Sequence, residues 1–473
     1  MARQYRHCAE YMPRAISATH LVKRRPDYGQ TVRAARGSVL ACADLAENPD
    51  FFFHWLRDSA VVIDALRILI EDGTLREEGL RLFGEFIEFS LTISRLDGRA
   101  NPRGEQERAG VLPDFAKNLR THAEMAEIHG DRALGEARLG ADGRLDIFRW
   151  QRPQNDGPAL RALAAMRYWR NRELRPFLPL AALRALIEGD LDFTCKVWRE
   201  PCYDLWEERW GRHYHTQIVQ FAALSDGAEW ARSLGDGRRA EGYASAAPEA
   251  ARVLAQYFEA RSSAYLTPLA DPGLNPAATP RLDFAAILGV VQAARRDGPH
   301  SPADPRALAT LRRLEDLFDR IYPINRDRPV ECGTAHGRYE GDIYFTGGAF
   351  YFSTFAAAEF YYQFATAAAC SENIALSSDN RENLAELLAE DGSRLGGETL
   401  RPAFHARLAR ALIARGDAVM AAARRFAPES GLLAEQFSQI DGAPVSAQSL
   451  AWSYAAFLTA FASRRQALRA TGL

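Results

Sequence analysis

Two adjacent glutamates lie between tryptophans in the stretch YDLWEERWG, residues 203–211. Glu207 and Glu208 follow Trp206 directly and precede Trp210. Burial of a carboxyl group beside apolar rings raises its pKa, and a raised pKa suits a general acid. The alternative is a solvated first turn of a helix, in which both glutamates would face water. The two tryptophans favour the catalytic interpretation.

Four further stretches place polar side chains among aromatic ones, close to where helices are expected to begin. They are FFFHWLRDSA (51–60), WQRPQNDGPALRA (150–162), HGRYEGDIYFTGG (336–348) and LLAEQFSQIDG (432–442). The QNDGP segment of the second also has the composition of an ordinary turn. If consecutive inner helices of a toroid begin on one face, all of these loops meet there. Such a cluster indicates a helical protein that binds or hydrolyses sugars.

Each polar group in these stretches also has a purely structural explanation. Asp58 could cap a helix, whereas the pair that it forms with Arg57 could hydrogen-bond two sugar hydroxyls. Arg338 and Asp342 could form an ordinary surface ion pair, which contributes little to stability. Glu435, taken alone, is more simply a solvent-facing glutamate, because charged side chains are seldom buried. Spacing along the chain does not connect any two of these acids.

Apolar residues with helical spacing run through most of the chain. In one such segment Val62, Leu66 and Leu69 recur at the i, i+4 and i+7 positions of a helix face. The segment 446–460 is similar, with Ser446 as its expected N-cap. Comparable patterns predict helices at 30–46, 75–95, 157–170, 180–199, 215–233, 238–260, 303–322, 349–369, 382–390 and 402–425. Strand-like alternation is scarce, so we expect an all-α domain of about twelve helices, alternately inner and outer.

Two long segments contain few helical patterns. The segment 97–152 has few apolar residues and several glycines, and 265–281 is punctuated by four prolines. Long loops in compact domains tend to be functional. We therefore expect both segments to be loops, and no linker that would divide the chain into domains.

Composition and charge restrict the class of protein. The chain has 473 residues, of which 47% are hydrophobic and 25% charged, as expected for a globular protein. The formal net charge of −2 gives no reason to expect nucleic acid or an anionic membrane as a partner. The N-terminal residues lack the apolar core of a secretory signal, and no stretch reaches the roughly 20 apolar residues of a membrane span. We expect a cytoplasmic monomer, unless a signal has been removed.

The cysteines do not indicate a metal site or a disulfide framework. The six are Cys8, Cys42, Cys195, Cys202, Cys332 and Cys370. They are scattered and contain no C-x-x-C pair, so isolated thiols are the simplest interpretation. No metal and no other cofactor is expected.

Several motifs together resemble the glucoamylases of glycoside hydrolase family 15, particularly the fungal and yeast branch. The matching motifs are W-x-R-D-S (55–59), R-P-Q-N-D-G-P-A-L-R-A (152–162), Y-D-L-W-E-E (203–208), G-R-Y-x-x-D (337–342), E-Q-F (435–437) and S-A-x-x-L-x-W-S-Y-A-A-x-L-T-A (446–460). They occur in the family's order and span about residues 50 to 460. The resemblance implies an (α/α)6 barrel with its active site at the mouth formed by the inner-helix loops.

The activity that the resemblance implies is exo-hydrolysis of α-1,4-glucosidic bonds from non-reducing ends, with inversion and release of β-glucose. Glu207 would be the general acid and Glu435 the general base. Glu208 would contact the sugar in the next subsite. An inverting enzyme needs its two carboxyl groups roughly 6.5–9.5 Å apart, with room for one water, and needs no metal. The expected partners are α-glucan oligosaccharides.

The resemblance also assigns substrate-binding residues. Arg57 and Asp58 would hold the terminal hydroxyls of the glucose at subsite −1, and Arg338 would bind the sugars at −1 and +1. Trp150 would stack on or hydrogen-bond near the +1 sugar. Further residues around the substrate would be Trp55, Leu205 through its main chain, Trp206 and Trp452. Asp204 and Gln154 would orient the acid and Trp150, and Asp342 would support the site without touching substrate.

The chain departs from the family's pattern at two positions. The family often has a Tyr six residues before the Arg of W-x-R-D, where this chain has Phe51. That hydroxyl helps to hold the catalytic water, so we expect slower turnover or replacement by another group such as His54. Phe350 stands where fungal members have a Trp after G-R-Y-x-x-D, so subsite affinities are expected to differ.

The positions of the motifs lead to an expected domain organisation. We expect one (α/α)6-barrel catalytic domain over 1–473, with residues 1–28 as an extension packed on or near the barrel. Neither an N-terminal β-domain nor a C-terminal starch-binding module is expected, so soluble maltooligosaccharides or dextrins are the expected substrates. An α-1,6-glucan or trehalose specificity is the nearest alternative. A phosphorylase would need a phosphate cradle in place of Glu435, and a non-catalytic sugar-binding protein would be expected to lack one of the two acids.

Overall fold

Six helices form a closed inner ring in the computed structural model, which describes residues 1–45, 48–100, 108–271, 273, 279–371 and 373–472. In chain order they are α2 (Leu56–Glu71), α6 (Gly157–Arg170), α8 (Tyr214–Ser233), α10 (Ala285–Ala293), α13 (Tyr351–Cys370) and α16 (Ala451–Thr471). Each helix packs against the next, and α16 packs against α2 and closes the ring.

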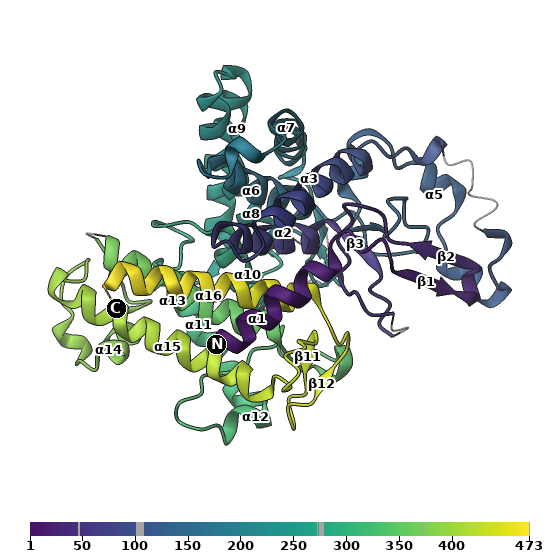
Figure 1. Ribbon diagram of the computed structural model, residues 1–473. Helices are drawn as coiled ribbons and strands as arrows, with labels where there is room; N and C mark the ends of the chain where they lie inside the picture. Colours follow the sequence, from purple (N-terminus) through teal and green to yellow (C-terminus); the bar gives the residue numbers. More distant parts are fainter. Residues whose placement is uncertain (46–47, 101–107, 272, 274–278, 372, 473) are drawn as a thin grey trace.

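Six further helices pack around this ring. They are α1 (Ala2–Tyr11) on α16, α3 (Arg76–Ile93) on α2, α7 (Leu180–Val197) on α6, α9 (Gly237–Leu254) on α8, α11 (Pro305–Ile321) on α10 and α15 (His405–Phe426) on α13. In the inner helix α13, 15 of 20 residues are buried, whereas in the outer helix α15 only 9 of 22 are buried. Inner helices thus have neighbours on all sides and outer helices bury one face. The expected (α/α)6 barrel is confirmed (Figure 1).

Alternation between the two rings sets the direction of the helices. Because an outer helix returns the chain between two inner helices, all six inner helices run the same way. Their N-terminal ends therefore lie at one end of the barrel, together with the segments that lead into them.

Short antiparallel strands and short helices lie around the barrel in the described part of the chain. The strand pairs are β1 (Val22–Arg25) with β2 (Gln30–Arg33), β3 (Phe53–Trp55) with β4 (Arg138–Gly140), and β5 (Cys202–Tyr203) with β6 (Trp210–Gly211). Two three-stranded sheets are β7 (Phe258–Glu259), β8 (Ala264–Thr267) and β9 (Arg281–Leu282), and β10 (Ala349–Phe350), β11 (Gln436–Phe437) and β12 (Pro444–Val445). The short helices are α5 (His122–Ala126), α12 (Pro323–Arg326) and α14 (Arg381–Leu388).

The long segment 97–152 forms a second, smaller core beside the barrel, so far as its described residues extend. Its apolar side chains pack with Phe53, Trp55 and Phe89 rather than with the main core. In Figure 1 the hairpin β1–β2 and helix α5 lie on this side, at the opposite edge of the view from α14. The segment, which was expected to be a loop, therefore contains strand β4 and packs a small core against strand β3.

Some predicted helices differ from the structure. No helix occupies 30–46: residues 30–33 form β2, and the described part of the rest is irregular. Gly37 has a φ of +82°, and a Cβ there would lie 2.1 Å from the Glu85 carbonyl oxygen, so the chain bends sharply at a glycine. The last helix begins at Ala451, and Ser446 has a φ of +65° outside it.

Two of the twelve barrel helices have no counterpart among the predicted ones. Helix α10 is apolar on every face, with eight of its nine residues buried, so it has no amphipathic period to detect. Helix α1 lies in the segment 1–28 that was expected only to pack on or near the barrel. It packs on α16, and its Gln4 side chain donates to the Gly431 carbonyl at 2.9 Å.

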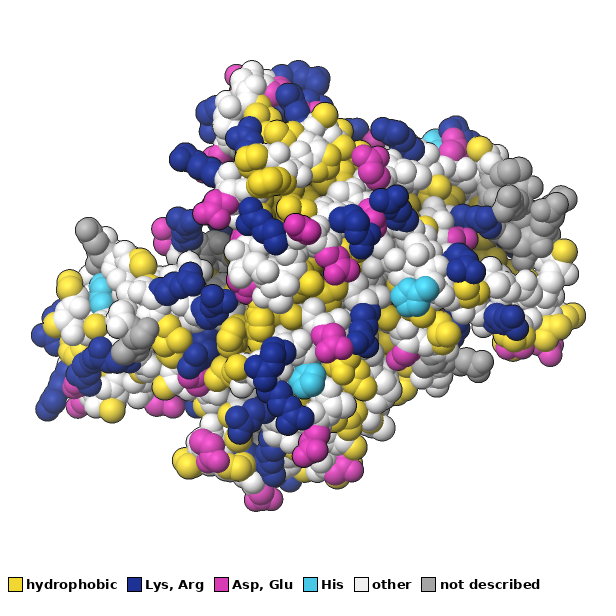
Figure 2. All heavy atoms as spheres, viewed as in Figure 1, with side chains coloured by type: hydrophobic (Ala, Val, Ile, Leu, Met, Phe, Trp, Pro, Cys, Tyr) yellow, Lys and Arg dark blue, Asp and Glu magenta, His cyan; other side chains and the backbone are white. Residues whose placement is uncertain are grey.

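The surface carries both signs of charge. Figure 2 shows Lys and Arg side chains interspersed with Asp and Glu over the visible face, with no broad field of one sign. No helix within the described residues has the length and apolar character to cross a membrane. All six cysteines fall within the described part of the chain and are free thiols.

Candidate active site

The sequence-predicted site residues lie in the segments that lead into the inner helices. Trp55 immediately precedes α2, Trp150 and Gln154 precede α6, and Glu207 precedes α8. The stretch 338–350 leads into α13, and 435–446 leads into α16. The barrel therefore brings together motifs that are distant in sequence. Close approach is built in at Gly157, where a Cβ would lie 2.6 Å from the Cβ of Leu56.

Glu207 lies in the tight turn of the β5–β6 hairpin, not in the first turn of a helix. Its φ is +65°, a left-handed conformation that costs energy for a residue other than glycine. Asp204 holds the turn: its Oδ1 accepts from the main-chain N–H groups of Glu208 at 2.8 Å and Arg209 at 3.1 Å. Burial raises the pKa of Asp204 to about 6. Asp204 therefore hydrogen-bonds to the main chain directly after Glu207.

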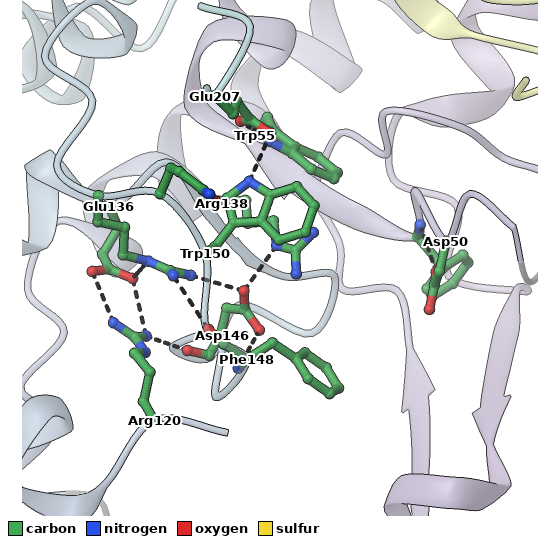
Figure 3. A network of polar contacts seen from close by, with 12 residues as sticks. Asp50, Trp55, Arg120, Glu136, Arg138, Asp146, Phe148, Trp150 and Glu207 are labelled. Carbon is green, nitrogen blue, oxygen red and sulfur yellow. Dashed lines mark hydrogen bonds and ion pairs between the residues drawn. The ribbon is translucent and has the colours of Figure 1, made fainter. Parts of the chain in front are cut away.

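The carboxyl group of Glu207 accepts hydrogen bonds from four side chains. Trp55 Nε1 donates to Oε1 at 2.8 Å, and Trp150 Nε1 donates to Oε2 at 2.6 Å (Figure 3). Gln154 Nε2 and Arg57 Nη2 also donate to Oε1, at 3.1 and 3.4 Å. The side chain keeps 15% of its exposure, so it is held firmly and is still reachable.

Arg57 and Asp58 begin the first turn of α2 beside this carboxyl group. Arg57 Nη1 donates to Gln154 Oε1 and to Asp156 Oδ2, both at 2.9 Å, and its Nε lies 3.8 Å from Asp58 Oδ2. Burial raises the pKa of Asp58 to about 6, although the Arg57 charge opposes this. Asp156 is thus a buried partner of Arg57 that sequence reasoning treated only as part of a turn.

Glu435 lies just before strand β11, in the segment that leads into the last inner helix, α16. Its carboxyl group accepts a hydrogen bond from the Ser446 hydroxyl. Burial raises the pKa of Glu435 to about 7, while the Ser446 hydroxyl and the Arg338 charge act to lower it. The negative charges of Asp58 and Glu207 also raise the pKa of Glu435, so these three acids share one electrostatic environment.

Glu208 belongs to a second cluster next to Glu207. Its Oε1 lies 2.9 Å from Arg338 Nη2, and its Oε2 accepts a hydrogen bond from the Tyr339 hydroxyl. Asp342 binds the other side of the Arg338 guanidinium, whose Nε donates to it at 2.7 Å. Arg338 and Asp342 are therefore nearly buried partners in the site, and not a surface ion pair.

Aromatic rings connect Trp206, which precedes Glu207, with the first turns of α13 and α16. The ring of Phe352 stacks on Trp452 at 4.4 Å between centroids and lies 6.3 Å from the ring of Trp206. Trp206 donates its indole N–H to Asp283 Oδ1 at 2.8 Å. Leu205 beside it is buried. Trp206 and Trp452 thus belong to one continuous aromatic wall.

The structure rules out His54 as a substitute for the family's Tyr hydroxyl, and it shows where Phe51 and Phe350 lie. His54 is fully buried, and its Nδ1 accepts from the Val39 N–H at 2.9 Å, so it does not replace the family's Tyr hydroxyl. Trp55, the next residue in strand β3, points to the opposite side of the strand. Phe51 is half-buried, with its ring 5.4 Å from that of Trp55. Phe350 is buried, 5.9 Å from Trp206.

Sequence reasoning missed three side chains that contact the site. Ser446 was expected to be a helix cap but hydrogen-bonds to Glu435. Tyr344 hydrogen-bonds through its hydroxyl to Ser446, and burial together with the Glu435 charge raises its pKa. Arg138 stacks behind the tryptophans. The G-R-Y-x-x-D motif stops two residues before Tyr344, whereas nothing in the local pattern marks Arg138.

The residues of this site do not form a metal centre. Among the described residues, no group of three or more His, Cys, Asp or Glu side chains is arranged to hold a metal ion. The arrangement instead has the parts for proton transfer: two carboxyl groups in different surroundings, hydrogen-bond donors, and aromatic walls.

The chain is similar in sequence to glucoamylases over most of its length. The chain is 30% identical to "Glucoamylase P" of Amorphotheca resinae over 443 residues, which cover 92% of this chain and 66% of that protein. The chain thus spans about two thirds of that relative's length. It is 26% identical to the "Probable glucoamylase" of Schizosaccharomyces pombe, with 96% of this chain and 91% of that protein covered.

Solved glucoamylase structures are also similar to this chain. The glucoamylase structure from Hormoconis resinae matches 98% of this chain and 73% of that chain, with a TM-score of 0.78 and 28% sequence identity. The glucoamylase from Saccharomycopsis fibuligera, at 24% identity, shares the fold with a TM-score of 0.79. The family description "Glycosyl hydrolases family 15" matches residues 25–462, and the chain therefore belongs to that family.

Proposed function

We propose that the protein is an inverting, exo-acting glucoamylase that hydrolyses terminal α-1,4-glucosidic bonds of maltooligosaccharides and dextrins and releases β-D-glucose. The observation that carries this proposal is the meeting of two acids from separate loops. Glu207 and Glu435 interact electrostatically, and the charge of Asp58 acts on Glu435 as well. A sugar ring bound beside Asp58 would therefore lie close to both acids.

The proposed reaction gives Glu207 and Glu435 different roles, because the two carboxyl groups lie in different surroundings. Glu207 would donate its proton to the glycosidic oxygen as that bond breaks. Glu435 would take a proton from the water that attacks the anomeric carbon from the opposite face. Inversion results because the water enters opposite to the leaving glucoside. One proton leaves Glu207 and one arrives at Glu435, so exchange with water resets the pair.

Substrate binding would use the charged pairs and the rings. Arg57 and Asp58 offer a donor and an acceptor side by side, which suits adjacent hydroxyls of the terminal glucose. Arg338 and Glu208 would bind hydroxyls of the next sugar. Trp150 would face the same sugar, because aromatic rings pack well on the apolar faces of pyranose rings. The proposal takes the chain as one catalytic domain that acts as a monomer.

The test is the release of glucose from maltose, maltotetraose, isomaltose and trehalose, with the anomer identified by NMR immediately after mixing. Wild type is compared with Glu207→Gln and Glu435→Gln, each of which removes one ionisable group with little change of shape. Glu359→Gln is the matched control. Glu359 is a buried carboxyl group within the barrel that hydrogen-bonds to Thr459 and Ser463.

The proposal expects β-glucose, fastest from maltotetraose, and a loss of several orders of magnitude in both site variants but not in the control. Faster hydrolysis of isomaltose or trehalose would keep the mechanism and change the specificity to an α-1,6-glucan or trehalose. Release of α-glucose would contradict inversion. Full activity in either site variant would remove that residue from its proposed role.

A further inference from the structure

Arg138 is a buried cation placed against the rings that hold Glu207. It belongs to strand β4 and pairs in register with Trp55 on β3. Only 4% of the residue is exposed. Its Cζ lies 3.6 Å from the centroid of the Trp150 ring, 4.1 Å from that of Phe53 and 5.1 Å from that of Trp55. These are cation–π distances, and burial strengthens such contacts.

The two tryptophans beneath Arg138 have a second contact each. Their indole N–H groups donate to the two oxygens of Glu207, at 2.8 Å from Trp55 and 2.6 Å from Trp150. Figure 3 shows Arg138 beside the indole of Trp150, with Glu207 beyond the indole nitrogens. Each ring thus has a cation near its face and a carboxyl group at its N–H edge. The positive charge of Arg138 beside the ring face polarises the indole and strengthens its N–H as a hydrogen-bond donor.

Arg138 is held by a larger ionic cluster. Its Nε donates to Asp146 Oδ2 at 2.8 Å, and Arg152 donates to the same oxygen at 2.8 Å and to Glu136 at 2.8 Å. Arg120 binds Glu136 through two hydrogen bonds of 3.1 Å. Three guanidinium groups therefore face two carboxylates, and one positive charge is not matched inside the cluster.

The charge of Arg138 also couples to the carboxyl group of Glu207. Burial lowers the pKa of Arg138, and the charges of Asp146 and Glu207 both act to raise it. The charged or titratable groups that act on Glu207 or are acted on by it are Arg57, Arg138, Asp58, Glu435 and Tyr344. Arg57 and Arg138 are the two cations of this set, and Arg138 lies against the rings of both tryptophans.

We propose that Arg138 is a positioning residue for the general acid, which fixes both indole rings and places a positive charge behind their N–H groups. This inference rests on the proposed function, because it takes Glu207 as the acid. Arg138 itself contacts neither substrate nor the reacting atoms. Its charge lies behind the two indole N–H groups that donate to the carboxyl group of Glu207.

The test compares wild type, Arg138→Gln and Arg138→Lys by two measurements. The first is the indole N–H NMR signals of Trp55 and Trp150 in ¹⁵N-tryptophan-labelled protein, followed against pH and assigned with Trp55→Phe and Trp150→Phe. The second is the alkaline limb of the kcat/KM profile. Glutamine can still donate to Asp146 but has no charge, whereas lysine keeps the charge and lacks the planar group.

The matched control is Arg25→Gln. Arg25 also stacks on Phe53, with its Cζ 4.3 Å from the ring, and also binds a carboxylate, donating to Asp50 at 2.6 Å. It contacts neither tryptophan ring within cation–π range among the described residues. Thermal unfolding of every variant checks its fold. If Arg138→Gln does not fold, Arg138→Met takes its place, because its unbranched side chain can fill the space against the rings.

We expect the indole titration and the alkaline limb of Arg138→Gln to move upward together by about half a pH unit or more, the scale of a nearby opposite charge. We expect kcat to fall about tenfold with little change in KM, the scale of one buried cation–π contact. Arg138→Lys should restore both midpoints. No shift in Arg138→Gln relative to Arg25→Gln, or an equal shift in Arg138→Lys, would overturn the proposal.

The two proposals fail separately. If wild type releases no glucose from any substrate, the proposed function fails, yet the NMR midpoints still test Arg138. If wild type is active and depends on Glu207 while the midpoints are indifferent to Arg138, only the role of Arg138 is rejected.

Discussion

The indole nitrogen of Trp150 lies 2.6 Å from Oε2 of Glu207, and that of Trp55 lies 2.8 Å from its Oε1. Each oxygen of one carboxyl group therefore accepts from a different tryptophan. The two rings come from segments almost a hundred residues apart, joined by the β3–β4 pair. Because Glu207 has a left-handed backbone, these hydrogen bonds also help to hold a strained turn in place.

Trp150→Phe should lower kcat/KM for maltotetraose by about tenfold to a hundredfold, since a hydrogen bond to a charged group contributes roughly 1.5–3 kcal/mol. Phenylalanine replaces the indole by a smaller aromatic ring without an N–H, so a π face stays beside Arg138 while the hydrogen bond to Glu207 is lost. The control is Trp230→Phe, because Trp230 is buried in α8 and its Nε1 has no partner among the described residues. Equal effects of the two substitutions would mean that the Trp150 N–H is not used.

Ser446→Ala should move the acid limb of the kcat/KM profile to higher pH. Glu435 must be ionised to act as a base, and burial raises its pKa to about 7, while the Ser446 hydroxyl donates to the carboxylate and lowers it. Removal of that donor raises the pKa of Glu435 further, by about one unit or less. Activity at pH 5 should therefore fall more than activity at pH 8.

The control for this prediction is Ser453→Ala. Ser453 lies nearby in α16, but its hydroxyl donates to the neutral carbonyl of Ala434 at 2.8 Å. It should leave the acid limb in place. An acid limb that stays fixed in Ser446→Ala would indicate that a group other than Glu435 governs it.

The fold could be predicted from the sequence because most helices have one apolar face. Ten of the twelve barrel helices overlap predicted segments, and the two missed ones show what periodicity cannot detect. Helix α10 is buried on all faces and α1 lies at the chain's end. The false helix at 30–46 has the apolar content of a helix but turns at Gly37, where a Cβ would collide with the Glu85 backbone.

The site could be predicted only where a motif marks it. Glu207 and Glu435 were chosen by resemblance to a family, because nothing local connects residues so far apart. The partners that complete the site were missed for a physical reason. Arg138 and Ser446 act through packing against residues from other loops, and no spacing rule relates such contacts to sequence.

Phe51→Tyr should raise kcat, by about tenfold on the scale of one positioned hydrogen bond to a reacting group. Phe51 is half-buried with its ring 5.4 Å from that of Trp55, and the added hydroxyl would supply the group that family resemblance places there. Steady-state rates on maltotetraose provide the measurement, with the exposed Phe177→Tyr as a control. An unchanged kcat in a folded variant would mean that another group, with Tyr344 as the candidate, already holds the water.

Glu359→Gln should stabilise the protein above pH 7 and have little effect near pH 4. Burial raises the pKa of Glu359 to about 7 from an ordinary 4.5, against the opposing hydrogen bonds from Thr459, Ser463 and Gln363. Between these two values the folded state binds a proton more tightly than the unfolded state, so the free energy of unfolding falls as pH rises. The cost of the charged form approaches about 3 kcal/mol above pH 7. Thermal unfolding of both proteins at pH 4.5 and pH 8 measures it, and a difference in Tm that does not change with pH would show that Glu359 keeps its proton affinity on folding.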